Sequence, residues 1–332
     1  MKYILLLLVI TLLGCSSNKK QEMTSKLKIP VINLSKNVSS VPSLLLSEVA
    51  EKLEIVPLEM TDESVLSDIT EMQVTDHNIW IDHGREFYIY RFSRSGKFLN
   101  KIGSIGQGPG EYTTYSTFLV DEDKKEVYII ANTNGVLAYD FEGNFKRKIV
   151  DIQTILQLFS SVYDQYILNN QKFFATQNFA LYRPIDKDSL WSFVSLGDDF
   201  QKKKYFKNPA HVGKEELIIA NRANMDRMVN YWREYLTSMD TYNGQLTLKY
   251  PDTDTIYCYD DATNQLLPQY AIFTDEEKGD YEATHLWFKD RKSFDYFSIF
   301  SYYPTKDFVY LIGSKGEEVY TYCYNKKDGS VI

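Results

Sequence analysis

Histidines and carboxylates do most acid–base and metal chemistry in proteins, and in this chain they are scattered. Two histidines follow an aspartate directly, in Asp76-His77 and Asp82-His83, which would suit an acid–base pair or two metal ligands. A third ligand in register is absent, as are a G-x-S-x-G elbow and a triad-like histidine and cysteine context. The sequence therefore predicts no catalytic residue, no metal and no cofactor.

A second group of candidate residues combines arginines with aromatic rings. Such residues recognise sugars or peptides, because the ring stacks on the ligand while the guanidinium makes planar hydrogen bonds. The aromatic members would equally suit strands packed between repeats, so both interpretations stay open. The candidate ligand-binding residues of this group are Arg183, Arg222, Arg227, Tyr231 and Trp232.

A glycine-rich loop at residues 106–112 is the third candidate. Its backbone N–H groups would suit an anion, as in nest-type sites, and Gln107 is a candidate ligand-binding residue on it. The loop lacks the Lys-Ser/Thr ending of a P-loop and the helix that should follow. A turn between repeats, with glycines at positive φ and a fixed φ at Pro109, is the alternative interpretation.

The first residues predict export. Lys2 precedes an uncharged apolar stretch at residues 3–13, which is the order of regions in a signal peptide. That stretch is shorter than the about 20 residues that a membrane-spanning helix needs, so we expect residues 1–14 to be cleaved.

The cleavage site also predicts an anchor. Leu12-Leu13-Gly14-Cys15 resembles the bacterial lipobox, in which the cysteine receives a diacylglycerol and becomes the first mature residue. We expect lipid on Cys15 to hold the protein at the outer membrane, facing the periplasm or the cell surface, with residues 15–42 as a lipidated terminus and flexible tether. An ordinary secretory signal with an incidental cysteine is the alternative.

The composition of the exported part favours strands. Aromatic residues make up 15% of the chain, and they suit pleated, half-buried strands. A net charge of -8 argues against a nucleic-acid partner, because phosphate binding needs a basic surface. Cys258 and Cys323 stand in similar tyrosine-flanked contexts, so we expect them at equivalent repeat positions, too far apart to form a disulfide.

Short alternating strands recur along the chain and indicate a repeat architecture. One unit covers residues 69–74, 78–81, 87–92 and 97–103, and the next covers 118–121, 126–130, 135–140 and 144–149. Gly96 and Gly143 mark the same turn about 47 residues apart, which is typical of a four-stranded propeller blade. Looser third, fourth and fifth units include residues 191–198, 255–260 and 318–325.

These units resemble a family, the six-bladed β-propeller lipoproteins of Bacteroidota, which look related to NHL and TolB-like propellers. The resemblance rests on residues 56–59, 61–64, 95–98, 103–112, 254–257 and 267–270. It implies an all-β fold of four-stranded antiparallel blades over residues 43–332. It implies no function, because propellers host unrelated activities.

The end of the chain bears on how the ring closes. We expect residues 53–58 to form an edge strand, suited by Pro57, that pairs with the end of the chain. Blade-marking turns occur near Gly96, Gly143, Gly197, Asn264 and Gly329, and only three residues follow the last. Because the resemblance implies six blades, we expect the C-terminal blade to be missing; a true five-bladed ring is the alternative.

Three functions agree with this sequence. The leading hypothesis is a lipid-anchored, non-enzymatic binding or scaffold module for a glycan, peptide or partner protein. One alternative is a propeller hydrolase or lyase that uses carboxylates such as Asp76, Asp82 or Glu234. The other is a structural subunit of an envelope assembly, which a broad exposed apolar patch would indicate.

Overall fold

The protein is seen in a computed structural model that describes residues 29–35, 45, 47, 50–84, 86–158, 161–177, 191, 193–201, 203–216, 238–250, 253–276, 297–316 and 318–332. These residues form five β-sheets and one short α-helix, α3 (Ile152–Leu158), with a single 3-10 turn, η1 (Pro209–His211). The prediction of an all-β fold is confirmed. Within these residues no helix is both long and apolar enough to cross a membrane.

Each of the first three sheets is an antiparallel meander of four consecutive strands. The first contains β2 (Glu71–Val74), β3 (Asn78–Asp82), β4 (Ile89–Ser93) and β5 (Phe98–Ile102). The second contains β6 (Tyr115–Asp121), β7 (Glu126–Ala131), β8 (Gly135–Asp140) and β9 (Phe145–Val150). The third contains β10 (Ser161–Leu168), β11 (Gln171–Gln177), β12 (Phe193–Leu196) and β13 (Lys203–Phe206).

The fourth and fifth sheets vary this plan. The fourth contains β14 (Ser238–Tyr242), β15 (Gln245–Lys249), β16 (Thr255–Asp260) and β17 (Gln265–Phe273), and β1 (Val31–Asn33) joins it beside β17. The fifth contains β18 (Ser298–Pro304), β19 (Phe308–Lys315) and β20 (Glu318–Asn325). After β20 the chain turns at Gly329, and Val331 forms a single antiparallel bridge to Tyr324.

The turns between third and fourth strands carry the predicted signals in three sheets. Gly96, Gly143 and Asn264 all adopt positive φ where β4, β8 and β16 turn back. The third sheet also turns near Gly197, whose carbonyl accepts from the Phe200 N–H at 2.9 Å, and there the positive φ falls on Phe200. The Phe200 ring is fully buried against Tyr128, so packing with the second sheet holds this turn.

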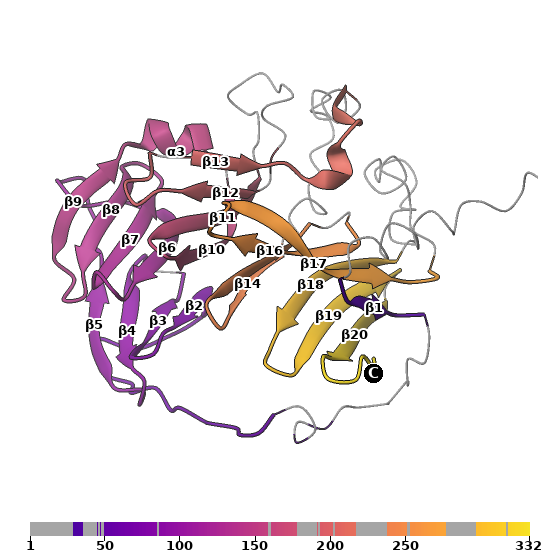
Figure 1. Cartoon of the computed structure of the whole chain (residues 1–332). Coiled ribbons are helices and arrows are strands. Elements are labelled where there is room, and N and C mark those ends of the chain that lie inside the picture. The colour runs from indigo at the N-terminus through magenta and orange to yellow at the C-terminus, as the bar shows by residue number, and fades with distance from the viewer. Residues whose placement is uncertain are drawn as a thin grey trace, which may run out of the picture.

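The sheets stack face to face in chain order and follow an arc (Figure 1). A separate apolar cluster fills each interface, for example Trp80 with Phe118 between the first and second sheets and Ile256 with Leu311 between the fourth and fifth. The first strand of each sheet lies innermost, where β6 contacts β10, β10 contacts β14 and β14 contacts β18. Among the described residues, none of these clusters joins the fifth sheet to the first.

The expected edge strand at residues 53–58 is wrong. This segment forms no strand and instead covers the outer face of the first sheet, where Val56 and Leu58 pack on a cluster that includes Tyr90. It is held by Glu59, whose backbone N–H donates to the Gly96 carbonyl at 2.8 Å and whose carboxylate accepts from the Phe98 N–H at 2.9 Å.

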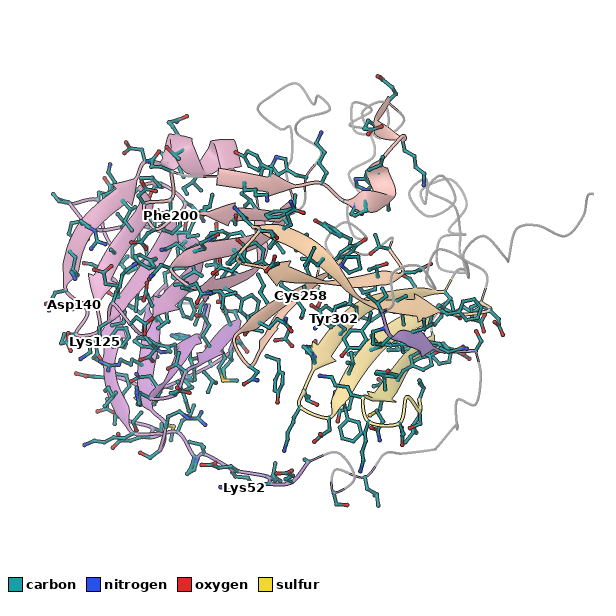
Figure 2. All side chains as sticks on the ribbon, in the orientation of Figure 1. Lys52, Lys125, Asp140, Phe200, Cys258 and Tyr302 are labelled. Carbon is teal, nitrogen blue, oxygen red and sulfur yellow. The ribbon has the colours of Figure 1, made fainter. Side chains whose placement is uncertain are left out.

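The N-terminal strand that pairs with a late part of the chain is β1. It lies within residues 15–42, the segment expected to be a tether. It runs parallel to β17 with Ile32 opposite Ile272, and Ile32 is fully buried between the fourth and fifth sheets. Cys258 and Cys323 lie in β16 and β20, the third strands of consecutive sheets, and both are free thiols as expected. Figure 2 labels Cys258 on β16.

Candidate binding site at the inner strands

Most of the residues that the sequence nominates lie outside the described residues. This holds for Cys15 with its signal peptide, and for the aromatic and arginine group of Arg183, Arg222, Arg227, Tyr231 and Trp232. Gln107 is described, and its side chain is exposed at the tip of the glycine-rich loop.

That loop is closed by its own hydrogen bonds. The Glu111 carboxylate accepts from the Gly108 N–H at 2.7 Å, and the Gly106 N–H donates to the Tyr112 carbonyl at 3.0 Å. Because the loop supplies its own carboxylate to the nest, these contacts favour the inter-repeat turn over an anion site. Tyr112 is fully buried and donates to the Phe87 carbonyl, which ties the loop to the first sheet.

The two aspartate-histidine pairs do not converge. Asp76-His77 lies exposed before β3, whereas Asp82-His83 lies at the other end of the same strand. Among the described residues, no group of three or more histidines, cysteines or carboxylates could hold a metal ion.

A polar cluster at the inner strands joins three sheets through one carboxylate, Glu71 of β2. Its Oε1 accepts from Gln73 Nε2 at 2.7 Å and from Gln165 Nε2 of β10 at 2.5 Å. Its Oε2 accepts from Thr117 Oγ of β6 at 3.0 Å. The first, second and third sheets thus each contribute at least one side chain to this site.

The cluster also contains a second carboxylate. Asp82 of β3 stands opposite Glu71 in the strand register, and such cross-strand neighbours have Cβ atoms roughly 5 Å apart. Burial, reinforced by the Asp82 charge, raises the pKa of Glu71 from 4.5 to about 7, although the Gln73, Thr117 and Gln165 donors oppose the rise. Burial and the Asp82 carboxylate likewise raise the pKa of Tyr115. Tyr115 precedes Thr117 by two residues in β6.

This arrangement suits hydrogen bonding to a polar ligand. With a pKa about 7, the Glu71 carboxyl either accepts or donates a hydrogen bond at neutral pH. Gln73, Gln165 and Asp82 are half-buried, so the cluster is not sealed in the core. We name Glu71, Gln73, Asp82, Thr117 and Gln165 the inner-strand cluster.

Sequence reasoning missed the inner-strand cluster. Glu71 and Gln73 lie two residues apart in β2, so their side chains point to the same face of the sheet. Nothing in the sequence shows that this face is the one toward Thr117. The strand that carries Gln165 was not predicted at all. Two amide donors 92 residues apart reach one carboxylate only because the sheets stack in order.

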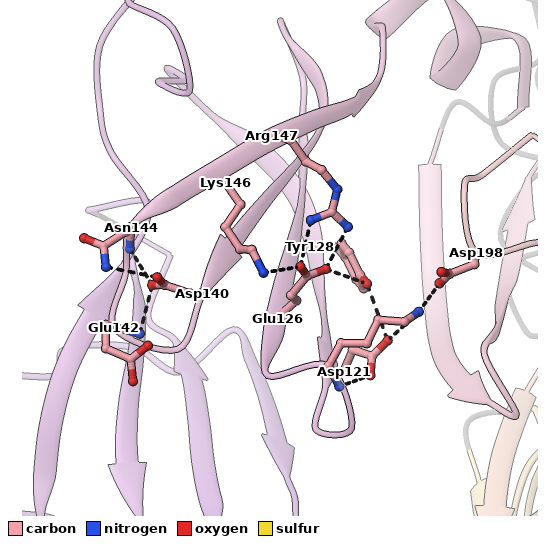
Figure 3. Close-up of polar contacts among 10 residues, drawn as sticks. Asp121, Glu126, Tyr128, Asp140, Glu142, Asn144, Lys146, Arg147 and Asp198 are labelled. Atoms are coloured by element: carbon pink, nitrogen blue, oxygen red, sulfur yellow. Dashed lines mark hydrogen bonds and ion pairs between the residues drawn. The ribbon is translucent and has the colours of Figure 1, made fainter.

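A second polar group, between the second and third sheets, has a structural role (Figure 3). Arg147 makes two hydrogen bonds to the buried Glu126 carboxylate at 2.7 and 2.9 Å, and these lower the pKa of Glu126 to about 2. The fully buried Lys172 ammonium lies 2.7 Å from Asp198, which also pairs with Lys124. Each of these charges has an opposite partner, and the Lys124–Asp198 pair connects the second sheet to the third.

Comparison with known proteins places the chain in a family. The chain belongs to the family described as "Domain of unknown function (DUF4934)", whose model matches residues 29–332. That description names neither a propeller nor a lipoprotein. No curated protein matches the chain.

Two solved structures from Bacteroides share the fold. A Bacteroides fragilis protein described as exported is 19% identical, with a TM-score of 0.60 over 84% of this chain and 74% of its own. A DUF4221-family member from Bacteroides vulgatus is 12% identical, with a TM-score of 0.50 over 83% of each chain. The extracellular domain of a B. thetaiotaomicron hybrid two-component system is 12% identical, with a TM-score of 0.41 over 82% of this chain and 28% of its own.

Proposed function

We propose that the protein is a lipid-anchored, extracytoplasmic binding module of the β-propeller type whose inner-strand cluster binds a glycan, peptide or partner protein. The observation that carries the proposal is the Glu71 carboxylate, which gathers donors from three successive inner strands. Carboxylate, amide and hydroxyl groups together form the hydrogen-bond set that recognises polar ligands.

Three observations support the architecture and the location. Four-stranded antiparallel meanders that stack in chain order around an arc are the arrangement of propeller blades. The residues before β1 have the order of a signal peptide and a lipobox-like Leu-x-Gly-Cys15. A structural relative of similar fold is described as exported.

Array screening tests the binding half of this proposal. The chain without residues 1–24 retains every described residue and should bind a discrete set of glycans or peptides. A compound bound at the inner-strand cluster should be recovered chemically unchanged after incubation. An array with no bound compound would contradict the proposal, and turnover that is lost in Glu71→Gln and Asp82→Asn would contradict a purely binding role of the cluster.

A hydrolase is a second candidate, because two carboxylates stand opposite each other in the inner-strand cluster. With a pKa about 7, Glu71 holds a proton near neutral pH as a general acid would, and Asp82 would be the base or nucleophile. Asp76 takes no part, because it lies at the other end of β3. Bond cleavage that is lost in both Glu71→Gln and Asp82→Asn would favour this candidate over the binding module.

A further inference from the structure

A chain of hydrogen bonds on the outer side of the first sheet begins at a buried histidine. His83 is 3% exposed and its ring packs edge-on against Tyr90 of β4, with the ring centroids 4.7 Å apart. His83 Nε2 lies 2.9 Å from the Tyr90 hydroxyl. Tyr90 belongs to the apolar cluster that residues 56–66 cover, whereas the inner-strand cluster lies at the interface with the second sheet.

The partners of Tyr90 indicate which ring nitrogen of His83 donates to it. The Tyr90 hydroxyl lies 2.6 Å from Glu86 Oε2, which also lies 3.1 Å from Lys101 Nζ. The hydrogen bonds from Tyr90 and Lys101 lower the pKa of Glu86, and burial raises the pKa of Tyr90. The phenol therefore stays protonated and donates a hydrogen bond to the Glu86 carboxylate. The phenol oxygen therefore accepts from His83 Nε2–H, which leaves the lone pair of the imidazole ring on Nδ1.

That lone pair faces a serine. The Ser67 Oγ lies 3.5 Å from His83 Nδ1, and with Nε2 protonated the serine hydroxyl is the donor. Ser67 is exposed to solvent, unlike the histidine beneath it. A hydroxyl, an imidazole base and a group that orients the base form the arrangement of an activated nucleophile, and such contacts are often long before substrate binds.

We propose that Ser67 is a nucleophile that takes the acyl group of small carboxylic esters, with His83 as its base. The Ser67 Oγ forms a bond to the ester carbonyl carbon, the bond from that carbon to the leaving alcohol oxygen breaks, and the serine proton passes through His83 Nδ1 to the leaving alkoxide. Water then attacks the acyl-serine with His83 again as base, which releases the carboxylic acid and restores Ser67. Tyr90 and Glu86 are positioning residues, because they act only through the histidine.

Covalent labelling of the chain with a fluorophosphonate probe and hydrolysis of p-nitrophenyl acetate test the proposal. Mass spectrometry should find the probe on Ser67. Ser67→Ala should abolish the label and His83→Gln should slow it about a hundredfold, which is the scale of general-base catalysis. Ser95→Ala is the matched control, because Ser95 is also exposed but contacts Ser93 and no histidine, and it should label at the wild-type rate.

The proposal would be overturned if the wild-type chain took no label or took it on a residue other than Ser67. It would also be overturned if Ser67→Ala, or a folded His83→Gln, were labelled as fast as the wild type. Ser67→Ala removes only an exposed hydroxyl and should fold normally, so its result stands even if His83→Gln unfolds. Tyr90→Phe removes the acceptor for His83 Nε2–H and should slow labelling when His83 is present but not in the His83→Gln background. A purely structural role of the phenol would slow labelling equally in both backgrounds.

Discussion

Glu71 is the residue on which the proposed site depends, because its carboxylate is both a structural link and the group that titrates near neutral pH. A solvent-exposed glutamate would lose its proton near pH 4.5, whereas burial holds this one protonated to about pH 7. The folded state therefore binds the Glu71 proton more tightly than the unfolded state does.

This difference predicts a pH-dependent stability. Below pH 4.5 Glu71 is protonated in both states, and as the pH rises to about 7 only the unfolded state gains by losing the proton. The free energy of unfolding should fall by about 3 kcal/mol over that window and then level off. Urea unfolding of the wild type and Glu71→Gln at a series of pH values measures the difference, and the glutamine variant should lack this slope. Parallel pH profiles of the two proteins would contradict the assignment.

Gly96 is the residue on which the covering segment of the first sheet depends. Its φ is +85°, and a Cβ at this position would lie 2.0 Å from the Pro57 carbonyl oxygen. Gly96→Ala should therefore cost more than the about 1 kcal/mol of left-handed strain alone, because residues 56–59 must also move. Gly244→Ala is the control, since it has φ +72° and open space around it. Equal losses in the free energy of unfolding would show that the contact with Pro57 is unimportant.

At the scale of the element, β1 is the least expected part of the fold. It has three residues, yet it places Ile32 fully buried in the interface between the fourth and fifth sheets. Ile32→Ala should lower the free energy of unfolding by about 2 to 5 kcal/mol, as for other large core truncations. Val31→Ala, in the same strand but 43% exposed, should change it by less than about 1 kcal/mol. Similar small effects for both variants would mean that β1 contributes little to stability.

The elements that the sequence predicted best are those with both alternation and a turn signal. The strands β8, β16 and β20 match their predicted bounds, because Gly or Asn turns separate clear apolar alternation there. The strands β10 and β11 were missed because Asp164, Gln165 and Lys172 interrupt the alternation. Lys172 is fully buried with Asp198 as its partner, and a sequence cannot show that such a pairing makes a lysine suitable for the core.

At the scale of the molecule, the arc of stacked sheets explains why the inner-strand cluster could not be predicted. Glu71, Thr117 and Gln165 are each unremarkable polar residues in their own strands. They meet because the first strand of each sheet lies innermost, so that strands from different repeats come together. The fold class follows from local pattern, whereas the site follows from the order in which the sheets stack.

The anchor gives a prediction for the whole molecule. If Cys15 carries the lipid, the wild-type chain expressed in a bacterium should incorporate labelled fatty acid and sediment with the outer membrane. Cys15→Ser should lose the label and leave the membrane fraction. A wild-type chain that incorporates no fatty acid would instead indicate an ordinary secretory signal.

The most direct test of the central claim is a calorimetric titration of an array-identified ligand into three forms of the chain. Gln165→Ala removes one donor to Glu71, and Gln245→Ala removes an exposed glutamine of the fourth sheet as the matched control. If the ligand binds at the inner-strand cluster, Gln165→Ala should raise the Kd at least about tenfold, or about 1.4 kcal/mol, while Gln245→Ala binds like the wild type. The same Kd in Gln165→Ala and wild type would contradict the claim and place the ligand elsewhere on the protein.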